Sequence, residues 1–162
     1  MSDPIEILEA DLDNESHQQA VLAMINEYAC DAFGQSRPLD DDVKQSLVGE
    51  LRDHPTTHIM LAYSGEEPVG IAVCFRGFST FKAKPLLNIH DLGVHRDHRG
   101  QGIGWKLLDA AERKARELGC CRLTLEVADL NAARQLYRRF GFVGDDQATA
   151  EQKSWFMDKH FD

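Results

Sequence analysis

The stretch RGQGIG, residues 99–104, combines one arginine with three glycines at alternate positions. Glycine lets the backbone turn tightly and brings peptide N–H groups close to a ligand. The helical pattern that begins near Ile103 adds unpaired N–H groups and the positive end of a helix dipole, which together bind anions. Because the planar guanidinium of Arg99 matches phosphate oxygens, we expect this stretch to hold a diphosphate.

Two other phosphate-binding motifs do not fit this stretch. A dinucleotide fingerprint G-x-G-x-x-G that began at Gly100 would need glycine at position 105, where Trp105 stands. The P-loop pattern G-x-x-x-x-G-K-[ST] does not occur in the sequence. The expected anion site is therefore of another kind.

The elements around this loop follow from apolar periodicity and from glycine and proline punctuation. We expect helices over residues 14–33, from an N-cap at Asp40 to about Asp53, over 102–118 and over 131–140. We expect strands over residues 5–10, 58–63, 68–75, 85–94, 121–127 and, from KSWFMDKHF, 153–161. This order predicts an α/β (α+β) fold in which a mixed sheet is covered by helices on both faces.

Strict alternation along the strand over residues 85–94 predicts which side chains share a face. His90 is expected to lie on the same face as Asn88 and Leu92. Asp91 is expected on the other face, with Leu87, Ile89 and Gly93.

The charge of the chain is unevenly distributed. The formal net charge is −9, and residues 1–60 carry 13 acidic and 3 basic side chains. Such a segment either forms a face that prefers cations or is the solvated surface of two amphipathic helices. This balance argues against nucleic acid as a partner.

Length and composition favour one cytoplasmic domain that spans residues 1–162. No apolar run approaches the roughly 20 residues of a membrane span, and the acidic N-terminal residues do not resemble a signal peptide. The four cysteines contain no C-x-x-C pair, and their spacing suits neither a disulfide framework nor a zinc site. We therefore expect no metal and no membrane partner.

Two motifs carry a resemblance to a known family. LGVHRDHRGQGIGWKLL resembles the acetyl-CoA-binding motif R/Q-x-x-G-x-G/A of the GNAT superfamily of N-acetyltransferases, which Arg99, Gly102 and Gly104 match. NAARQLYRRFGF resembles the second motif of the superfamily through Tyr137, Gly141 and Phe142. The resemblance implies a splayed, mostly antiparallel sheet, acetyl-CoA as the acetyl donor, and an amine as the acceptor. Because members are often dimers, it also allows a homodimer.

The resemblance implies roles for individual residues. The pantetheine arm would pair with the backbone of Leu92, Gly93 and Val94, between the fourth and fifth strands. The diphosphate would lie on the amides of Arg99, Gly100, Gln101, Gly102, Ile103 and Gly104. Tyr137 matches the general acid that protonates the CoA thiolate. Asn131 either contacts the cofactor or caps its helix, because it precedes Tyr137 by six residues where many relatives have seven.

Three residues are candidates for the general base. His90 ranks first, because arylalkylamine N-acetyltransferases have histidine at the similar position and an imidazole can accept the ammonium proton. Asp91 and Glu126 follow, and His90 could instead be a strand residue satisfied by hydrogen bonds. FSTFKAKPLLNIHDLGV is similar to polyamine and thialysine acetyltransferases, which favours a small cationic amine. The alternatives are a protein N-terminal or lysine acetyltransferase, and a CoA-binding regulatory module without catalysis.

Overall fold

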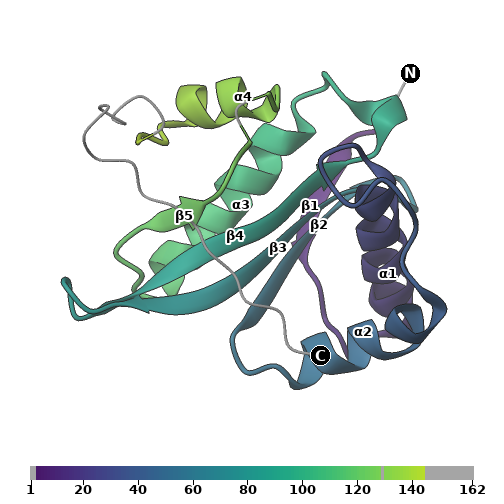
Figure 1. Cartoon of the computed structure of the whole chain (residues 1–162), viewed down its shortest axis with the longest axis horizontal. Coiled ribbons are helices and arrows are strands. Elements are labelled where there is room, and N and C mark those ends of the chain that lie inside the picture. The colour runs from purple at the N-terminus through teal and green to yellow at the C-terminus, as the bar shows by residue number, and fades with distance from the viewer. Residues whose placement is uncertain (1–2, 129, 145–162) are drawn as a thin grey trace.

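A central sheet with helices on both faces organises the chain (Figure 1). The computed structural model describes residues 3–128 and 130–144. The strands are β1 Ile5–Glu9, β2 Thr57–Ser64, β3 Glu67–Ser79, β4 Lys84–Val94 and β5 Leu123–Leu125. The helices are α1 Glu15–Cys30, α2 Asp41–Asp53, α3 Ile103–Glu117 and α4 Ala133–Phe140, with a short 3₁₀ helix at Arg96–His98.

The five strands lie in the order β1-β2-β3-β4-β5. The first three pairs are antiparallel, and β4 and β5 are parallel. A parallel pair needs a crossover connection, which α3 provides between these two strands. The predicted mixed, mostly antiparallel sheet covered on both faces is therefore confirmed.

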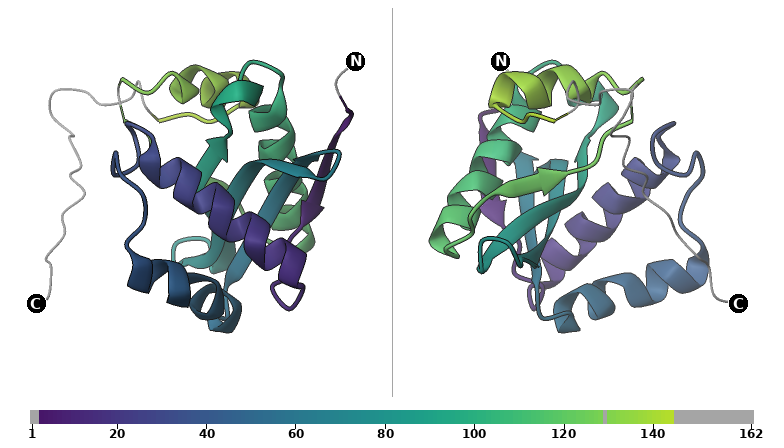
Figure 2. Two further views of the ribbon diagram at one scale, coloured as in Figure 1. Left: turned by 90° about the vertical axis from the view of Figure 1, so that its right-hand side faces the viewer. Right: turned by 60° about the vertical axis from the view of Figure 1, so that its left-hand side comes forward.

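Helices cover both faces of the sheet (Figure 2), and one apolar core lies on each face. On one face α1 and α2 cover the sheet, and Val21 and Met24 of α1 pack with Leu61 of β2. On the other face Leu107 and Leu108 of α3 pack with strand residues that include Leu87 and Ile89 of β4. Burial of these side chains, worth about 25 cal/mol per Å² of apolar surface, holds both helical layers on the sheet.

Local signals place the helix ends close to where they are predicted. The Asn14 side chain accepts a hydrogen bond from the His17 N–H at 3.2 Å and caps α1. Gly102, at φ +80°, precedes α3, and Gly119, at φ +71°, follows its end. These positive φ values are open to glycine at little steric cost, so glycine marks both ends of α3.

The fifth strand is shorter than predicted. The prediction of a strand over residues 121–127 is wrong at both ends, because β5 covers only Leu123–Leu125. Before it, the Cys121 N–H donates to the Pro85 carbonyl at 2.8 Å as part of the turn that leads from α3. The final strand expected at residues 153–161 lies outside the described residues.

Within residues 3–128 and 130–144, no helix has the length and the apolar character needed to cross a membrane.

Candidate functional site

β4 and β5 separate along their length. They pair only over Leu87–Ile89 and Leu123–Leu125. In the described part of the chain, residues 90–94 of β4 have no strand partner on the β5 side. The backbone N–H and C=O groups on that edge are therefore open to an extended ligand, which can bind as an added strand does.

A β-bulge in β4 sits at His90. Asp91 lies opposite Val73 of β3, whereas Ile89 lies opposite Cys74, so His90 is an extra residue without an opposite neighbour. A bulge re-aims side chains by breaking strict alternation. The bulge was not predicted from the sequence, because no local residue pattern marks an extra residue in an apolar strand.

Because of the bulge, some side chains of β4 lie on a different face of the sheet from the one that strict alternation predicts. Leu92 packs in the same core as Leu87 and Ile89, so the expectation that Leu92 shares a face with His90 is wrong. His90 instead lies against Phe75, with ring centroids 5.6 Å apart at 67°. Phe75 packs on the α1–α2 side of the sheet, as does Val73 opposite Asp91. His90 and Asp91 therefore both project toward the helical layer of α1 and α2.

The loop before α3 uses its glycines in two ways. Gly100 and Gly102 have φ of +76° and +80°, and a Cβ there would meet no described heavy atom within 4 Å. Glycine is needed at these two positions for the backbone conformation. Gly104 has a packing role, because a Cβ on it would lie 2.8 Å from Leu136 Cδ2 of α4.

The α3 N-terminus keeps donors available for a ligand. Its N-cap, Gly102, has no side chain with which to accept a hydrogen bond from the first turn. The first N–H groups of a helix lack partners within the helix, and the dipole adds positive potential there. The loop therefore fits the anion-binding role that its sequence predicts.

A pocket of about 840 Å³ joins the open edge of β4 to this loop. Most of the predicted cofactor-binding residues line it, namely Leu92, Gly93, Val94, Arg99, Gly100, Gly102, Ile103, Gly104 and Asn131. Gln101 is exposed and is not among the lining residues. Residues from distant segments complete the wall, among them Tyr28, Asp31 and Arg139.

Tyr28 and Asp31 were not predicted as site residues. A Cβ on Gly93 would lie 3.2 Å from Tyr28 Cδ2, so the Tyr28 ring closes directly over the β4 backbone. In the sequence, Tyr28 fits the apolar face of its helix and Asp31 belongs to a general excess of acids. Only their contacts with residues far along the chain mark them as part of this pocket.

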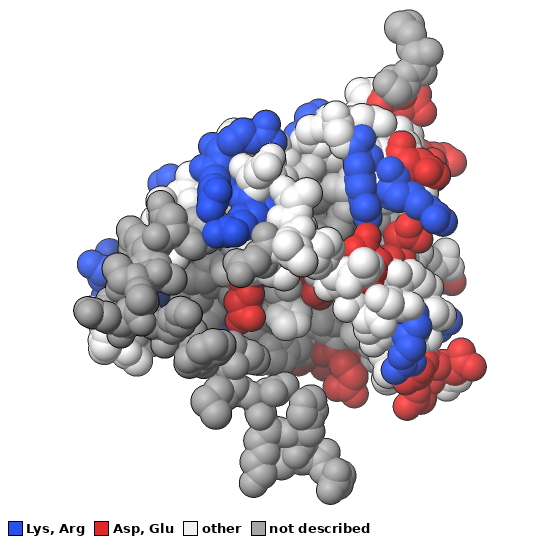
Figure 3. Space-filling model, turned by 45° about the horizontal axis from the view of Figure 1, so that its top comes forward, with Lys and Arg blue, Asp and Glu red and all other residues white. Residues whose placement is uncertain are grey.

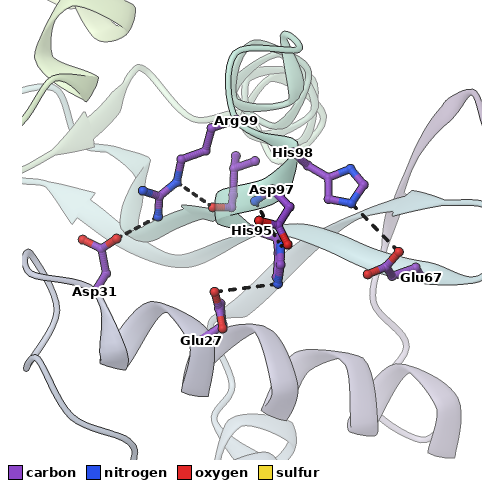
Figure 4. Close-up of polar contacts among 8 residues, drawn as sticks. Glu27, Asp31, Glu67, His95, Asp97, His98 and Arg99 are labelled. Carbon is purple, nitrogen blue, oxygen red and sulfur yellow. Dashed lines mark hydrogen bonds and ion pairs between the residues drawn. The ribbon is translucent and has the colours of Figure 1, made fainter. Parts of the chain in front are cut away.

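Arg99 is held in place by the protein (Figure 4). Its Nη2 donates to Asp31 Oδ2 at 2.7 Å, and its Nε donates to the Val94 carbonyl at 3.1 Å. On the same turn, His95 Nε2 lies 3.8 Å from Glu27 Oε1. In the described part of the chain, no group of three or more His, Cys, Asp or Glu residues is placed to hold a metal ion.

Charge differs across the surface near the pocket. Figure 3 shows one group of Lys and Arg side chains on one side of the viewed face, whereas on the other side Lys and Arg side chains lie among most of its Asp and Glu side chains. Arg138 and Arg139 lie exposed in the last turn of α4, and Arg139 also lines the pocket. A cationic rim favours the approach of an anionic ligand.

Comparison with known proteins identifies the family. Residues 21–142 match the model of the Acetyltransferase (GNAT) family. The chain belongs to the GNAT family. This confirms the family that the two motifs predict.

Known proteins resemble this GNAT chain in sequence and in fold. Thialysine N-epsilon-acetyltransferase of Bos taurus is 33% identical over 88 residues, which are 54% of this chain and 49% of the relative. Streptothricin acetyltransferase of Streptomyces lavendulae is 49% identical over 58 residues, 35% of this chain and 31% of the relative. The chain thus spans less than half the length of these two relatives. A crystal structure of a probable acetyltransferase is similar in fold, with a TM-score of 0.79 and 21% identity over 97% of this chain and 99% of that one.

In this GNAT chain, Tyr137 is buried on α4 and lines a second cavity of about 790 Å³, between α3, β5 and α4. Burial, and secondarily the nearby phenol of Tyr28, raises the pKa of Tyr137 to about 12. The phenol therefore stays protonated at neutral pH and can act only as a proton donor or a hydrogen-bonding group. Tyr137 is not among the residues that line the first pocket, although Tyr28, which acts on it electrostatically, is one of them.

The three candidate bases lie in different surroundings. Burial raises the pKa of Asp91, and the nearby His90 opposes that shift. The pKa of Tyr28 is raised by burial first, and then by the charges of Asp91 and Asp31. Glu126 is exposed just after β5, and none of the three candidates is among the residues that line either cavity. His90 and Asp91 thus lie together, and Glu126 lies apart from them.

Asn131 stabilises the turn just before α4. Its Oδ1 accepts a hydrogen bond from the Ala133 N–H at 2.9 Å. The N-cap of α4 is Ala132 and has no side-chain capping hydrogen bond, so the expectation that Asn131 caps the helix is wrong by one position. Asn131 also lines the pocket, and its contact with a cofactor stays a prediction.

Proposed function

We propose that this chain is an acetyl-CoA-dependent N-acetyltransferase whose acceptor is a small cationic amine. One observation carries the proposal, namely that the open edge of β4 and the glycine loop before α3 form one wall of the same pocket. A strand edge binds an amide-containing arm, and the adjoining helix N-terminus binds a diphosphate. Acetyl-CoA has these two parts in this order.

The donor would lie along this wall. The pantetheine amides would pair with the backbone of Leu92, Gly93 and Val94, and the diphosphate would rest on the amides of residues 99–104. Gly100 and Gly102 suit this fit, because they leave the loop backbone uncovered. Asn131 and Arg139 line the pocket on the α4 side and would contact the cofactor there.

The side chains supply the proton transfers. With acetyl-CoA bound, the reaction forms an amide C–N bond and breaks the thioester C–S bond. Strand-end N–H groups of β4 would polarise the acetyl carbonyl as an oxyanion hole does. His90 would accept the ammonium proton of the amine, with the Asp91 carboxylate stabilising the imidazolium. Tyr137 would donate its phenolic proton to the departing sulfur.

A cationic acceptor agrees with the charges on the α1 side. After burial, the charges of Asp91 and Asp31 raise the pKa of Tyr28, so the surroundings of this ring are acidic. Carboxylates and an aromatic face are the groups that bind an ammonium ion. The bovine relative is named for the ε-nitrogen of thialysine, which supports an amine of this kind.

A thiol-release assay with acetyl-CoA over a broad amine panel tests the proposal. The panel should contain polyamines, lysine and its analogues, aminoglycosides, and peptides with free N-termini or lysine side chains. We expect saturable turnover with small cationic amines and a product that carries one acetyl group. Turnover with peptides alone would support a protein acetyltransferase. Saturable CoA binding without turnover on any amine would support a regulatory CoA-binding module.

A further inference from the structure

Asp31 lies directly after α1 and faces the loop before α3 across the mouth of the pocket (Figure 4). Its Oδ1 accepts the Phe33 N–H at 3.1 Å, which fixes the orientation of the carboxylate. Its Oδ2 accepts the Arg99 Nη2–H at 2.7 Å. The Phe33 N–H bond, and after it the Arg99 bond, hold the pKa of Asp31 below its ordinary value. Asp31 is thus an ionised group with both oxygens engaged.

Three interactions restrict the Arg99 side chain. Besides Asp31, the Val94 carbonyl accepts its Nε–H at 3.1 Å. The guanidinium also lies beside the C-terminal end of α1, whose dipole favours a cation and whose last turn contains no basic residue of its own. A guanidinium has several N–H donors, so these two bonds leave others for a ligand.

A second, weaker contact joins α1 to the loop before α3. Glu27 and His95 approach at 3.8 Å, and they precede Asp31 and Arg99 by the same four positions on their respective segments. The last turn of α1 therefore contacts the loop at two successive points. The stronger of the two contacts is the one between Asp31 and Arg99.

We propose that Asp31 is a positioning residue for donor binding, which acts by holding Arg99 ready at the mouth of the pocket for the diphosphate. The inference rests on the proposed function, because it takes the diphosphate to lie on residues 99–104. An arginine that is 56% exposed would otherwise lose side-chain entropy when it binds the ligand. Asp31 removes part of this cost by ordering the guanidinium before the ligand arrives.

The opposing effect is electrostatic. The Asp31 carboxylate would repel the diphosphate and compete with it for Arg99. Positioning and competition predict opposite results when the carboxylate is removed, so a pair of variants distinguishes them. Asp31→Asn keeps an oxygen that accepts hydrogen bonds but removes the charge, whereas Asp31→Ala removes both.

Titration of each purified variant with CoA and with pantetheine, which lacks the diphosphate, tests the proposal. We expect Asp31→Ala to bind CoA about fivefold more weakly than wild type, as for loss of one exposed ion pair, and Asp31→Asn to bind within about twofold. Pantetheine binding should be unchanged in both. In an Arg99→Ala background, Asp31→Ala should have no further effect. Glu67→Gln is the matched control, because it alters a carboxylate 3.9 Å from His98 of the same loop and should leave CoA affinity unchanged.

Each of the following results would overturn the proposal. Tighter CoA binding by both variants would mean that Asp31 competes with the ligand. An equal loss of pantetheine binding, or a loss that persists without Arg99, would mean that Asp31 only supports the local fold. Unchanged CoA affinity in Asp31→Ala, with a wild type that binds CoA, refutes this inference alone. A wild type that does not bind CoA refutes the proposed function as well.

Discussion

The phenol of Tyr137 illustrates how the surroundings of one residue set its chemistry. Burial on α4 raises its pKa to about 12, which makes the phenol a weaker acid than tyrosine in water. A weak acid can still protonate a thiolate when the transfer is short and the donor is held in place. His90 and Asp91 form the complementary pair, because the bulge in β4 directs both toward the α1 side.

Replacing Tyr137 by phenylalanine removes the proton donor and keeps the ring. We expect kcat to fall by about 10²-fold, the lower end of the range for general acid catalysis, while CoA affinity changes less than twofold. Steady-state kinetics and a CoA titration measure the two effects. Tyr63→Phe is the control: its buried hydroxyl has no hydrogen-bond partner among the described residues, and its loss should leave kcat unchanged. Equal kcat values for Tyr137→Phe and wild type would remove Tyr137 from its assigned role.

The pH dependence of kcat/KM separates His90 from Asp91. If an imidazole accepts the amine proton, activity should rise through an acidic limb near ~6–7.5. His90→Ala should abolish that limb and lower the rate by about 10²-fold or less, because water partly replaces the base. If the limb remains in His90→Ala and disappears in Asp91→Asn, the base is the aspartate. A limb that persists in both variants would direct attention to Glu126.

The burial of Asp91 determines whether Asp91→Asn raises or lowers the stability of the protein. Burial raises the pKa of Asp91 above its ordinary value of 3.8, so the folded protein retains the proton to a higher pH than the unfolded chain. The native state therefore loses stability as pH rises through the folded pKa. We expect Asp91→Asn to raise the melting temperature at pH 7, and the gain to vanish well below pH 4. Thermal melts across this range measure it, and a lower melting temperature at pH 7 would contradict the burial argument.

Among the elements, the junction of β4 with α3 holds the site together. β4 supplies an edge that β5 leaves open, and the loop turns the chain through two glycines with positive φ before α3 begins. α3 then packs on the sheet through Leu107 and Leu108, which are fully buried. The position of the helix N-terminus therefore depends on the core and not on the ligand.

Glycine substitutions test this junction. Gly102→Ala should destabilise the protein by about 1–2 kcal/mol, because φ of +80° strains a residue with a Cβ. It should weaken CoA binding as well. Gly49→Ala is the matched control: Gly49 lies inside α2 with no described atom within 4 Å of a Cβ, so alanine should stabilise by about 0.5–1 kcal/mol. Denaturant titrations compare the free energies of unfolding of the two variants. Equal changes would show that the positive φ at Gly102 does not determine the effect of its substitution.

At the scale of the whole molecule, one sheet carries two cores that share its strands. Leu61 and Leu107 are each fully buried, on opposite faces of the sheet. The loop before α3 would hold the donor diphosphate, with Arg99 positioned by Asp31, and the α1 side of the sheet carries His90 and Asp91, which would face the acceptor. The two substrates would thus meet where the sheet opens between β4 and β5.

Truncation on either face should unfold the same unit. We expect Leu61→Ala and Leu107→Ala each to lower the free energy of unfolding by about 2–5 kcal/mol. Both variants should unfold in one transition with the wild-type denaturant slope, because the strands couple the two cores. Two separate transitions in either variant would contradict the prediction of one domain over residues 1–162.

The sequence alone determined what depends on neighbouring residues. The glycine loop, the helix ends at Gly102 and Gly119 and the two GNAT motifs are local patterns, because backbone conformation and helix capping act over a few positions. These patterns were sufficient for the fold class, the family and about half of the residues that line the pocket.

Only the tertiary structure decided features that join distant segments. β4 pairs with β3 on both sides of His90, and the bulge accommodates the extra residue between the two paired segments. As a result, Asp91 and Leu92 lie on the faces opposite to those that alternation predicts. The Asp31–Arg99 pair joins residues 68 positions apart, and Tyr28 reaches Gly93 from α1. Their proximity results from packing α1 and α3 against one twisted sheet, and the spacing of residues along the chain does not encode it.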